Sequence, residues 1–265
     1  MASYKKLLVA SAKGGVGKST TSLGLAASFA EMGKKTLLCD LDNVSRSLDL
    51  LSGASEKSVC DLSDVIEGRE ITYVTPFDTH PTLSLIPACT QSFAERISSD
   101  RGKPFAHAVR DAVERIADEC EYDILICDTG AGIDMAKSVC DLFDMVIIVS
   151  EQGRTSIRAA DYAASEMISA GAKCQRLVIC SFDIDSVRRE KRAGVIEIID
   201  ASELCCIGVV PYDSQLQKAQ DAGRLVQKKS LSHIAYANIA KRILGYDTPL
   251  FYRMKPYRKK MRRAL

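Results

Sequence analysis

The segment Lys13-Gly14-Gly15-Val16-Gly17-Lys18-Ser19-Thr20 follows the apolar run 7–10 and leads into a helix-like stretch at 21–30. Its Gly-Lys-Ser end matches the last positions of the phosphate-binding pattern G-x-x-x-x-G-K-[ST]. Glycines let successive backbone N–H groups surround phosphate oxygens, and the helix that follows adds its positive N-terminus. The segment therefore predicts a loop that binds a nucleoside triphosphate.

Two side chains of this loop have predictable roles. Lys18 supplies a positive charge to the outer phosphates, and the hydroxyl group of Ser19 is placed to ligate Mg²⁺. The other residues predicted to contact the nucleotide are Gly14, Gly15, Val16, Gly17 and Thr20.

A second lysine, Lys13, stands at the start of the loop. This K-G-G-V-G-K-S pattern resembles the deviant Walker A loop of the MinD/ParA family of ATPases. The resemblance implies that Lys13 reaches across a homodimer interface to the phosphates bound by the partner subunit. A cation in that position would neutralise charge that develops during phosphoryl transfer. The resemblance also implies ATP and Mg²⁺ as cofactors and a dimer that forms when ATP is bound. The alternative is an ordinary solvated lysine.

Short apolar runs alternate with helix-like segments along most of the chain. The runs expected to form strands are 6–10, 36–39, 83–86, 124–127, 145–149, 177–180 and 205–209. Helices are expected near 19–32, 57–66, 103–119, 134–141, 155–169, 188–199, 214–222 and 232–244. This order predicts an α/β fold with a mostly parallel sheet and helices on both faces. The resemblance implies a P-loop NTPase fold of the SIMIBI type. We expect a single ATPase domain at 1–247 and a tail at 248–265.

The composition is that of an ordinary globular protein. Of its 265 residues, 46% are hydrophobic and 26% are charged. No apolar stretch approaches the roughly 20 residues of a membrane span, and the first residues leave no room for a signal peptide. None of the ten cysteines forms a C-x-x-C pair, which argues against an iron–sulfur carrier and favours reduced, buried thiols. We therefore expect a cytoplasmic protein.

Two aspartates, Asp40 and Asp42, follow the second predicted strand. Side chains two residues apart on an extended segment point the same way, so both carboxylates address one site. The segment resembles switch I of the MinD branch more than that of the plasmid-partitioning branch. That resemblance implies that Asp42 positions the attacking water and that Asp40 lies near Mg²⁺. The alternative is an exposed polar loop that caps the next helix.

A third acid, Asp128, ends the apolar run at 124–127. A carboxylate in this position holds Mg²⁺ through water in many P-loop proteins, so we predict Asp128 as a further metal residue. The segment that follows it resembles the family's switch II, usually D-x-P-A-G-I, with Gly130 in place of the proline.

Residues after the last two strands recognise adenine in this family. The matching positions here are Ser181-Phe182 and, in the segment 210–213, Pro211, Tyr212 and Asp213. Phe182 stands where arginine is common, and its ring is expected to stack on the base. Both segments also fit ordinary turns, so the preference for ATP over GTP rests on the resemblance.

Charge is unevenly distributed, because residues 251–265 contain seven Lys or Arg and no acid. The rest of the chain has 29 basic and 34 acidic residues, a net charge of −5. A basic amphipathic segment of this kind is typical of a helix that binds an anionic membrane surface. The predicted membrane residues are Phe251, Met254, Tyr257, Lys259, Lys260, Met261, Arg262 and Arg263. Nucleic acid, an acidic partner and a solvated tail are the alternatives.

The resemblance implies a slow, dimerising ATPase of the MinD type. Its ATP form would bind the inner face of the cell membrane, and hydrolysis would release it into the cytoplasm. Such a switch places the division site or a related structure and has a MinE- or MinC-like activator or effector. The alternatives are a ParA-like partitioning ATPase that binds DNA, an FlhG-like regulator of flagellar number, and a metabolic P-loop phosphotransferase. The last would not need Lys13.

Overall fold

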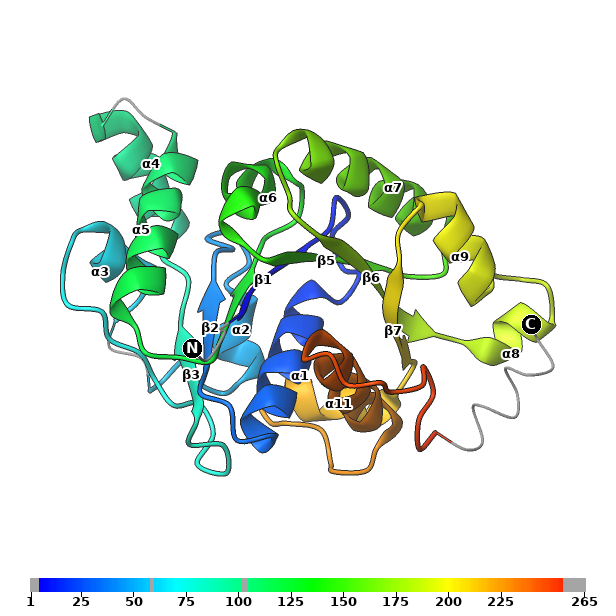
Figure 1. The fold of residues 1–265 in the computed structure, drawn as a ribbon. Helices are drawn as coiled ribbons and strands as arrows, with labels where there is room; N and C mark the ends of the chain where they lie inside the picture. Colours follow the sequence, from blue (N-terminus) through cyan, green and yellow to red (C-terminus); the bar gives the residue numbers. More distant parts are fainter. Residues whose placement is uncertain (1–4, 58–59, 102–103, 255–265) are drawn as a thin grey trace.

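The computed structural model describes residues 5–57, 60–101 and 104–254. Seven parallel strands form one sheet in the order β3-β2-β4-β1-β5-β6-β7 (Figure 1). The strands are β1 (Lys5–Ala10), β2 (Thr36–Asp40), β3 (Leu83–Ile86), β4 (Ile124–Asp128), β5 (Met145–Ser150), β6 (Gln175–Phe182) and β7 (Cys206–Pro211). All seven predicted strands are therefore confirmed, with ends that move by at most two residues.

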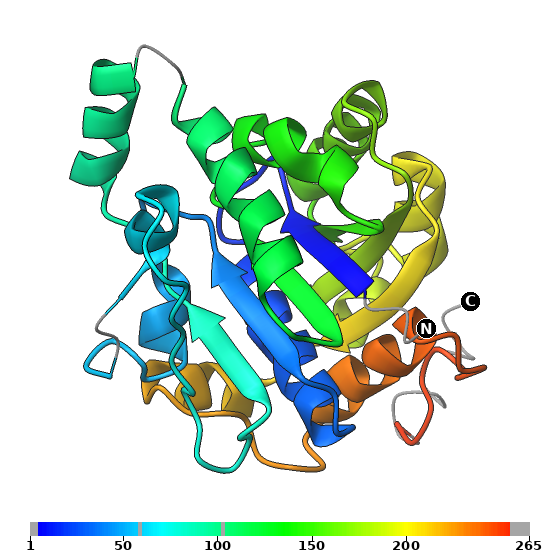
Figure 2. The same ribbon diagram turned by 60° about the vertical axis from the view of Figure 1, so that its left-hand side comes forward.

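Helices cover both faces of the sheet because its central strands are apolar on both sides. One layer contains α1 (Lys18–Glu31), α2 (Ser47–Leu51), α10 (Ser214–Asp221) and α11 (Leu231–Ile243) (Figure 1, Figure 2). The other contains α5 (Phe105–Glu119), α6 (Asp134–Val139), α7 (Arg154–Ser169) and α9 (Val195–Ser202). The remaining helices are α3 (Leu62–Ile66), α4 (Gln91–Arg101), α8 (Ile184–Arg188) and the 3₁₀ turn η1 (Cys140–Leu142).

Two predicted helices differ from those observed. The helix expected near 57–66 begins only at Leu62, because Asp61 accepts a hydrogen bond from the backbone N–H of Ser63 at 2.8 Å and caps the helix there. The helix expected near 188–199 is instead divided between α8 and α9. Glu190 lies between them with a φ of 55°, a left-handed conformation that interrupts a right-handed helix.

The folded domain continues beyond the predicted boundary at 247. Phe251 and Met254 are buried in the hydrophobic core, with 8% and 1% of their surface exposed. The guanidinium group of Arg242 donates hydrogen bonds to the carbonyl groups of Thr248 and Pro249, at 2.8 and 3.0 Å. These contacts fasten the segment to α11, so the domain extends at least to Met254.

This placement also corrects part of the membrane prediction. Phe251 and Met254 already pack against their own domain, so neither side chain faces outward toward a lipid surface. The other predicted membrane residues, Tyr257, Lys259, Lys260, Met261, Arg262 and Arg263, lie outside the described part of the chain. Within that part, none of the helices combines the length and the apolar character needed to cross a bilayer.

Candidate functional site

The predicted phosphate-binding loop connects the carboxyl end of β1 to the first turn of α1. Gly15 and Gly17 have φ values of 73° and 94°, a left-handed backbone that glycine adopts without steric cost. Gly17 directly precedes α1, and its carbonyl group accepts the hydrogen bond from the N–H of Thr21 at 2.9 Å. The loop therefore curls at the positive end of a 14-residue helix, the geometry that binds phosphate.

Lys18 is enclosed by the site, with only 7% of its surface exposed. Burial lowers the pKa of its ammonium group, and the negative charges of Asp128 and Asp42 oppose that shift. The charges of the three groups therefore interact in the folded chain. That they form one nucleotide site stays a prediction.

Asp128, at the end of β4, has one carboxylate oxygen available for a ligand. Its Oδ1 accepts a hydrogen bond from the hydroxyl group of Ser22 at 2.7 Å. Its Oδ2 is buried and has no hydrogen-bond partner among the described residues. Burial raises the pKa of this carboxyl to about 6, against the opposing effects of the hydroxyl groups of Ser19 and Ser22 and the charge of Lys18.

An unpaired, buried carboxylate oxygen costs free energy unless a cation or donor occupies its free side. Carboxylate and hydroxyl oxygens are the ligands that Mg²⁺ prefers. Asp128 and the neighbouring Ser19 therefore fit the predicted metal. Ser22 was not predicted, although it follows Ser19 by three positions in α1 and so shares its helix face.

Asp40 makes contacts of a different kind. Its Oδ1 accepts a hydrogen bond from the N–H of Asp42 at 2.9 Å, and its Oδ2 accepts one from the N–H of Leu48 at 3.1 Å. Burial and the charge of Asp128 raise its pKa well above the ordinary value, although the backbone donors oppose this. Asp40 thus fastens the loop between β2 and α2. Its role near Mg²⁺ stays a prediction.

Asp42 is 8% exposed, so the alternative of a solvated polar loop does not describe it. Its Oδ1 accepts hydrogen bonds from the backbone N–H groups of Val44 and Ser45, at 3.1 and 3.0 Å. Its carboxylate also lies beside Gly130, the residue that follows β4 by two positions. The predicted switch segments therefore meet at this aspartate.

Lys13 is half-buried, and its backbone N–H donates to the hydroxyl group of Ser11 at 3.2 Å. Across the described ranges, no acidic side chain forms an ion pair with its ammonium group. Its ammonium group therefore has no ion-pair partner in the described part of the chain, and the predicted contact with a partner subunit stays a prediction.

A cavity of about 170 Å³ joins the phosphate loop to the carboxyl ends of β6 and β7. It brings the predicted loop residues together with most of the predicted base-binding residues, namely Gly15, Gly17, Thr20, Ser181, Pro211, Tyr212 and Asp213. The sheet topology explains this arrangement, because the carboxyl ends of parallel strands meet at one edge where ligands bind.

Phe182 does not take the predicted position over a base. Its side chain is 1% exposed and is part of the core, where strand β6 pairs with β7 at Phe182 and Pro211. Ser181 before it has a φ of 50°, which interrupts the extended strand. The prediction that Phe182 stacks on adenine is therefore wrong.

Asp213 holds two helices in place. Its Oδ1 accepts a hydrogen bond from the N–H of Gln215 at 3.0 Å and caps α10. Its Oδ2 accepts one from the hydroxyl group of Ser232 at 2.7 Å, which ties α10 to α11. This aspartate therefore shapes the wall of the cavity.

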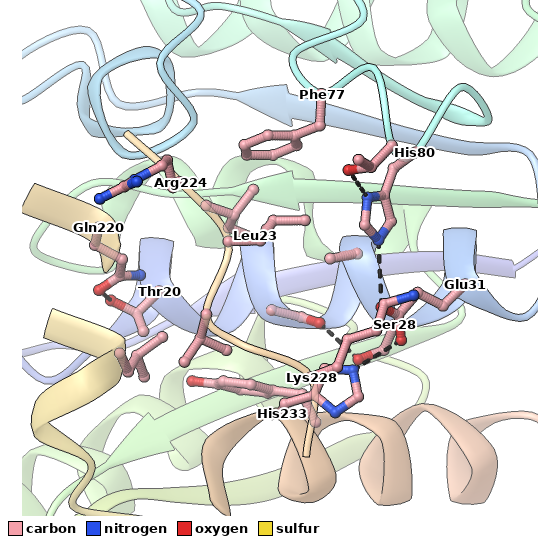
Figure 3. A pocket seen from close by; sticks show the side chains of 17 residues that line it. Thr20, Leu23, Ser28, Glu31, Phe77, His80, Gln220, Arg224, Lys228 and His233 are labelled. Carbon is pink, nitrogen blue, oxygen red and sulfur yellow. Dashed lines mark hydrogen bonds and ion pairs between the residues drawn. The ribbon is translucent and has the colours of Figure 1, made fainter. Parts of the chain in front are cut away.

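A second cavity, of about 380 Å³, lies along α1 beyond the phosphate loop (Figure 3), and no sequence pattern predicted it. At one end Glu31 faces two histidines, with 3.4 Å from its Oε1 to Nε2 of His80 and 2.9 Å from its Oε2 to Nε2 of His233. Lys228 lies 3.7 Å from the same carboxylate. Glu31 thereby joins α1 to the loop before β3 and to α11.

Comparisons with known proteins agree with this geometry. The family model described as CobQ/CobB/MinD/ParA nucleotide binding domain matches residues 7–226. The septum site-determining protein MinD of Bacillus subtilis is 30% identical over 253 residues, which cover 92% of this chain and 90% of that protein.

Two solved structures from Aquifex aeolicus show the same fold. The MinD cell division protein has a TM-score of 0.80 at 26% identity and covers 93% of this chain and 99% of its own. The MinC:MinD cell division protein complex has a TM-score of 0.82 at 26% identity, with 93% and 98% covered.

Proposed function

Because this chain belongs to the CobQ/CobB/MinD/ParA family of nucleotide-binding proteins, we propose that it is an ATP-hydrolysing molecular switch of the MinD type. The observation that carries the proposal is the buried, unpartnered Oδ2 of Asp128 beside the enclosed Lys18 and the glycine-rich loop. Such a pocket offers backbone donors and a cation to phosphate and an oxygen ligand to Mg²⁺.

In the proposed mechanism, the N–H groups of the loop and the ammonium group of Lys18 hold the phosphates of ATP. Ser19 and Asp128 hold Mg²⁺, which neutralises charge on the phosphate oxygens when it is bound. Asp42 orients the attacking water, and its buried carboxylate interacts electrostatically with Lys18.

The switch requires a second copy of the chain. We infer that Lys13 of each subunit contacts the phosphates of the other subunit, so that ATP binding and dimerisation become one equilibrium. The absence of an ion-pair partner for Lys13 among the described residues supports this role.

The proposed dimer binds an anionic membrane through its basic C-terminal tail. Two tails in one dimer gain from avidity, because the second binds at a high effective concentration. The protein would then alternate between the cytoplasm and the inner face of the cell membrane. Support comes from the six Lys and Arg residues after Met254, which is itself anchored in the core.

The proposed process is placement of the division site, with a MinC- or MinE-like protein as effector or activator. One similar solved structure, from Aquifex aeolicus, is a complex of MinC with MinD. The similar protein of Bacillus subtilis is named septum site-determining protein MinD. A ParA-like role on DNA is the second candidate, because a basic tail also neutralises phosphates of nucleic acid.

Two experiments test the proposal. Sedimentation with anionic vesicles, with and without ATP, is expected to recover the full chain only with ATP. Removal of residues 255–265 should abolish this recovery and leave the folded domain intact. ATP-dependent binding to DNA but not to vesicles would favour the ParA-like alternative.

The second experiment measures dimer mass by light scattering with an ATP analogue. Lys13→Ala is expected to bind the analogue but to stay monomeric. A variant that dimerises like the wild type would contradict the in-trans role of Lys13.

A further inference from the structure

The backbone of Gly130 approaches the carboxylate of Asp42 more closely than any other residue type would allow. A Cβ atom built on Gly130 would lie 2.9 Å from Oδ1, 3.0 Å from Cγ and 3.3 Å from Oδ2 of Asp42. Contacts under 3.0 Å are essentially never made by real Cβ atoms, so one of the two residues would have to move. The φ of Gly130 is not positive, so its backbone conformation does not require glycine. Glycine is required here because a side chain would have no room.

Asp42 has little freedom to move away. Its Oδ1, the atom nearest to the added Cβ, is held by the N–H groups of Val44 and Ser45. Its own N–H is held by Asp40, whose carboxylate is anchored to the loop and to α2. The side chain is short and 8% exposed. Displacing the carboxylate would therefore break hydrogen bonds inside a buried loop.

Asp42 follows the end of β2, where Asp40 is partnered with Asp128 at the end of β4. The Asp42 segment and Asp128 therefore lie at the same edge of the sheet, the edge that carries the phosphate loop. A catalytic carboxylate that orients water must be held within a fraction of an ångström of its productive position. The backbone of Gly130 limits where the Asp42 carboxylate can lie on the side that faces Gly130.

We propose that Gly130 is a positioning residue for ATP hydrolysis, and that its missing side chain leaves the space that the Asp42 carboxylate occupies. Gly130 contacts no reacting atom and acts only through Asp42. This inference rests on the proposed function, because it assigns to Asp42 the orientation of the attacking water.

The test is a double-mutant cycle on the full-length chain, measured as single-turnover hydrolysis of MgATP with enzyme in excess. Gly130→Ala is expected to lower the rate at least tenfold with an unchanged Kd for a non-hydrolysable ATP analogue. In an Asp42→Ala background, the same substitution should have no further effect, because the contact is gone. The matched control is Gly194→Ala, whose added Cβ would meet Val187 at an ordinary 3.7 Å.

Three outcomes would overturn the proposal. One is a wild-type rate in Gly130→Ala, and another is an equal fold-loss in the Asp42→Ala background. The third is a loss of folding in Gly130→Ala that Asp42→Ala restores, because the contact would then support stability and not hydrolysis. A wild-type chain that binds but never hydrolyses ATP would instead refute the proposed function itself.

Discussion

Asp40 and Asp128 occupy partnered positions on the neighbouring strands β2 and β4, but their carboxylates have different surroundings. Both oxygens of Asp40 accept backbone hydrogen bonds, whereas Asp128 has a buried oxygen without a partner among the described residues. The two residues end adjacent parallel strands, so their side chains reach the same edge of the sheet. One of them supports the loop, and the other has an oxygen free for a cation.

The first prediction compares these two aspartates. Asp128→Asn should weaken Mg²⁺-dependent ATP binding by about tenfold or more, because a neutral amide is a poorer ligand for a hard cation. Asp40→Asn should chiefly loosen the loop and lower the free energy of unfolding by about 1–2 kcal/mol. Isothermal titration with MgATP and denaturant unfolding measure the two effects. Equal losses of Mg²⁺ dependence in both variants would contradict this division of roles.

The second prediction concerns Glu31. Glu31→Gln removes a charged acceptor from two histidines and from Lys228, so the free energy of unfolding should fall by about 1–2 kcal/mol at pH 7. Guanidinium unfolding measures the change. The exposed Glu121, whose only ion pair in the described structure is with the exposed Lys35 at 3.6 Å, provides a control variant, Glu121→Gln, with little expected effect.

The stabilising effect of Glu31 should depend on pH. Burial alone would raise its pKa, but the hydrogen bonds from His233 and His80 and the charge of Lys228 lower it below the ordinary 4.5. A lowered pKa means that the contribution is complete above the unfolded-state pKa and is lost as the pH falls through the folded-state pKa. The difference between wild type and Glu31→Gln should therefore be constant above about pH 5 and decrease as the pH falls through the folded-state pKa, which lies below 4.5. A difference that stays constant down to the pH of acid unfolding would show that it does not come from the ionised carboxylate.

The third prediction separates the tail from the domain. A chain that ends at Met254 should unfold at the same denaturant concentration as the full chain. A chain that ends at Leu250 also loses the buried Phe251 and Met254, and its free energy of unfolding should fall by about 3 kcal/mol or more. Equal stability of the two truncated chains would contradict the burial of these side chains.

The fourth prediction concerns Gly24 inside α1. Alanine normally stabilises a helix by about 1 kcal/mol relative to glycine. Here an added Cβ would lie 2.5 Å from the ring of Tyr236 on α11, so Gly24→Ala should instead destabilise the protein by about 1–3 kcal/mol. Combining it with Tyr236→Leu should cost less than the sum of the two single changes, as measured by denaturant unfolding.

Some features of this protein were predictable because they depend on neighbours along the chain. The seven strands follow from runs of apolar residues, and the phosphate loop follows from glycine and lysine at fixed spacing before a helix. The carboxylates at 40, 42 and 128 could be assigned to one edge because parallel strands place their carboxyl ends together.

Other features depend on contacts between distant segments. A base-stacking Phe182 and a membrane-facing Met254 were reasonable predictions from their residue types, but packing placed both in the core. The bond between Ser22 and Asp128 joins residues 106 positions apart. Glu31 meets His80 and His233 across 49 and 202 positions.

The sequence by itself thus determined the sheet, the phosphate loop and the set of charged groups at the edge of the sheet. These features depend on the spacing of residues along the chain and on the direction in which each strand runs, and both can be read from the order of residues. Only the tertiary structure decided which oxygen of which aspartate is free, and that Gly130 leaves room for Asp42. Those facts depend on differences of a few tenths of an ångström in the distances between atoms of separate loops, which no pattern of residue types specifies.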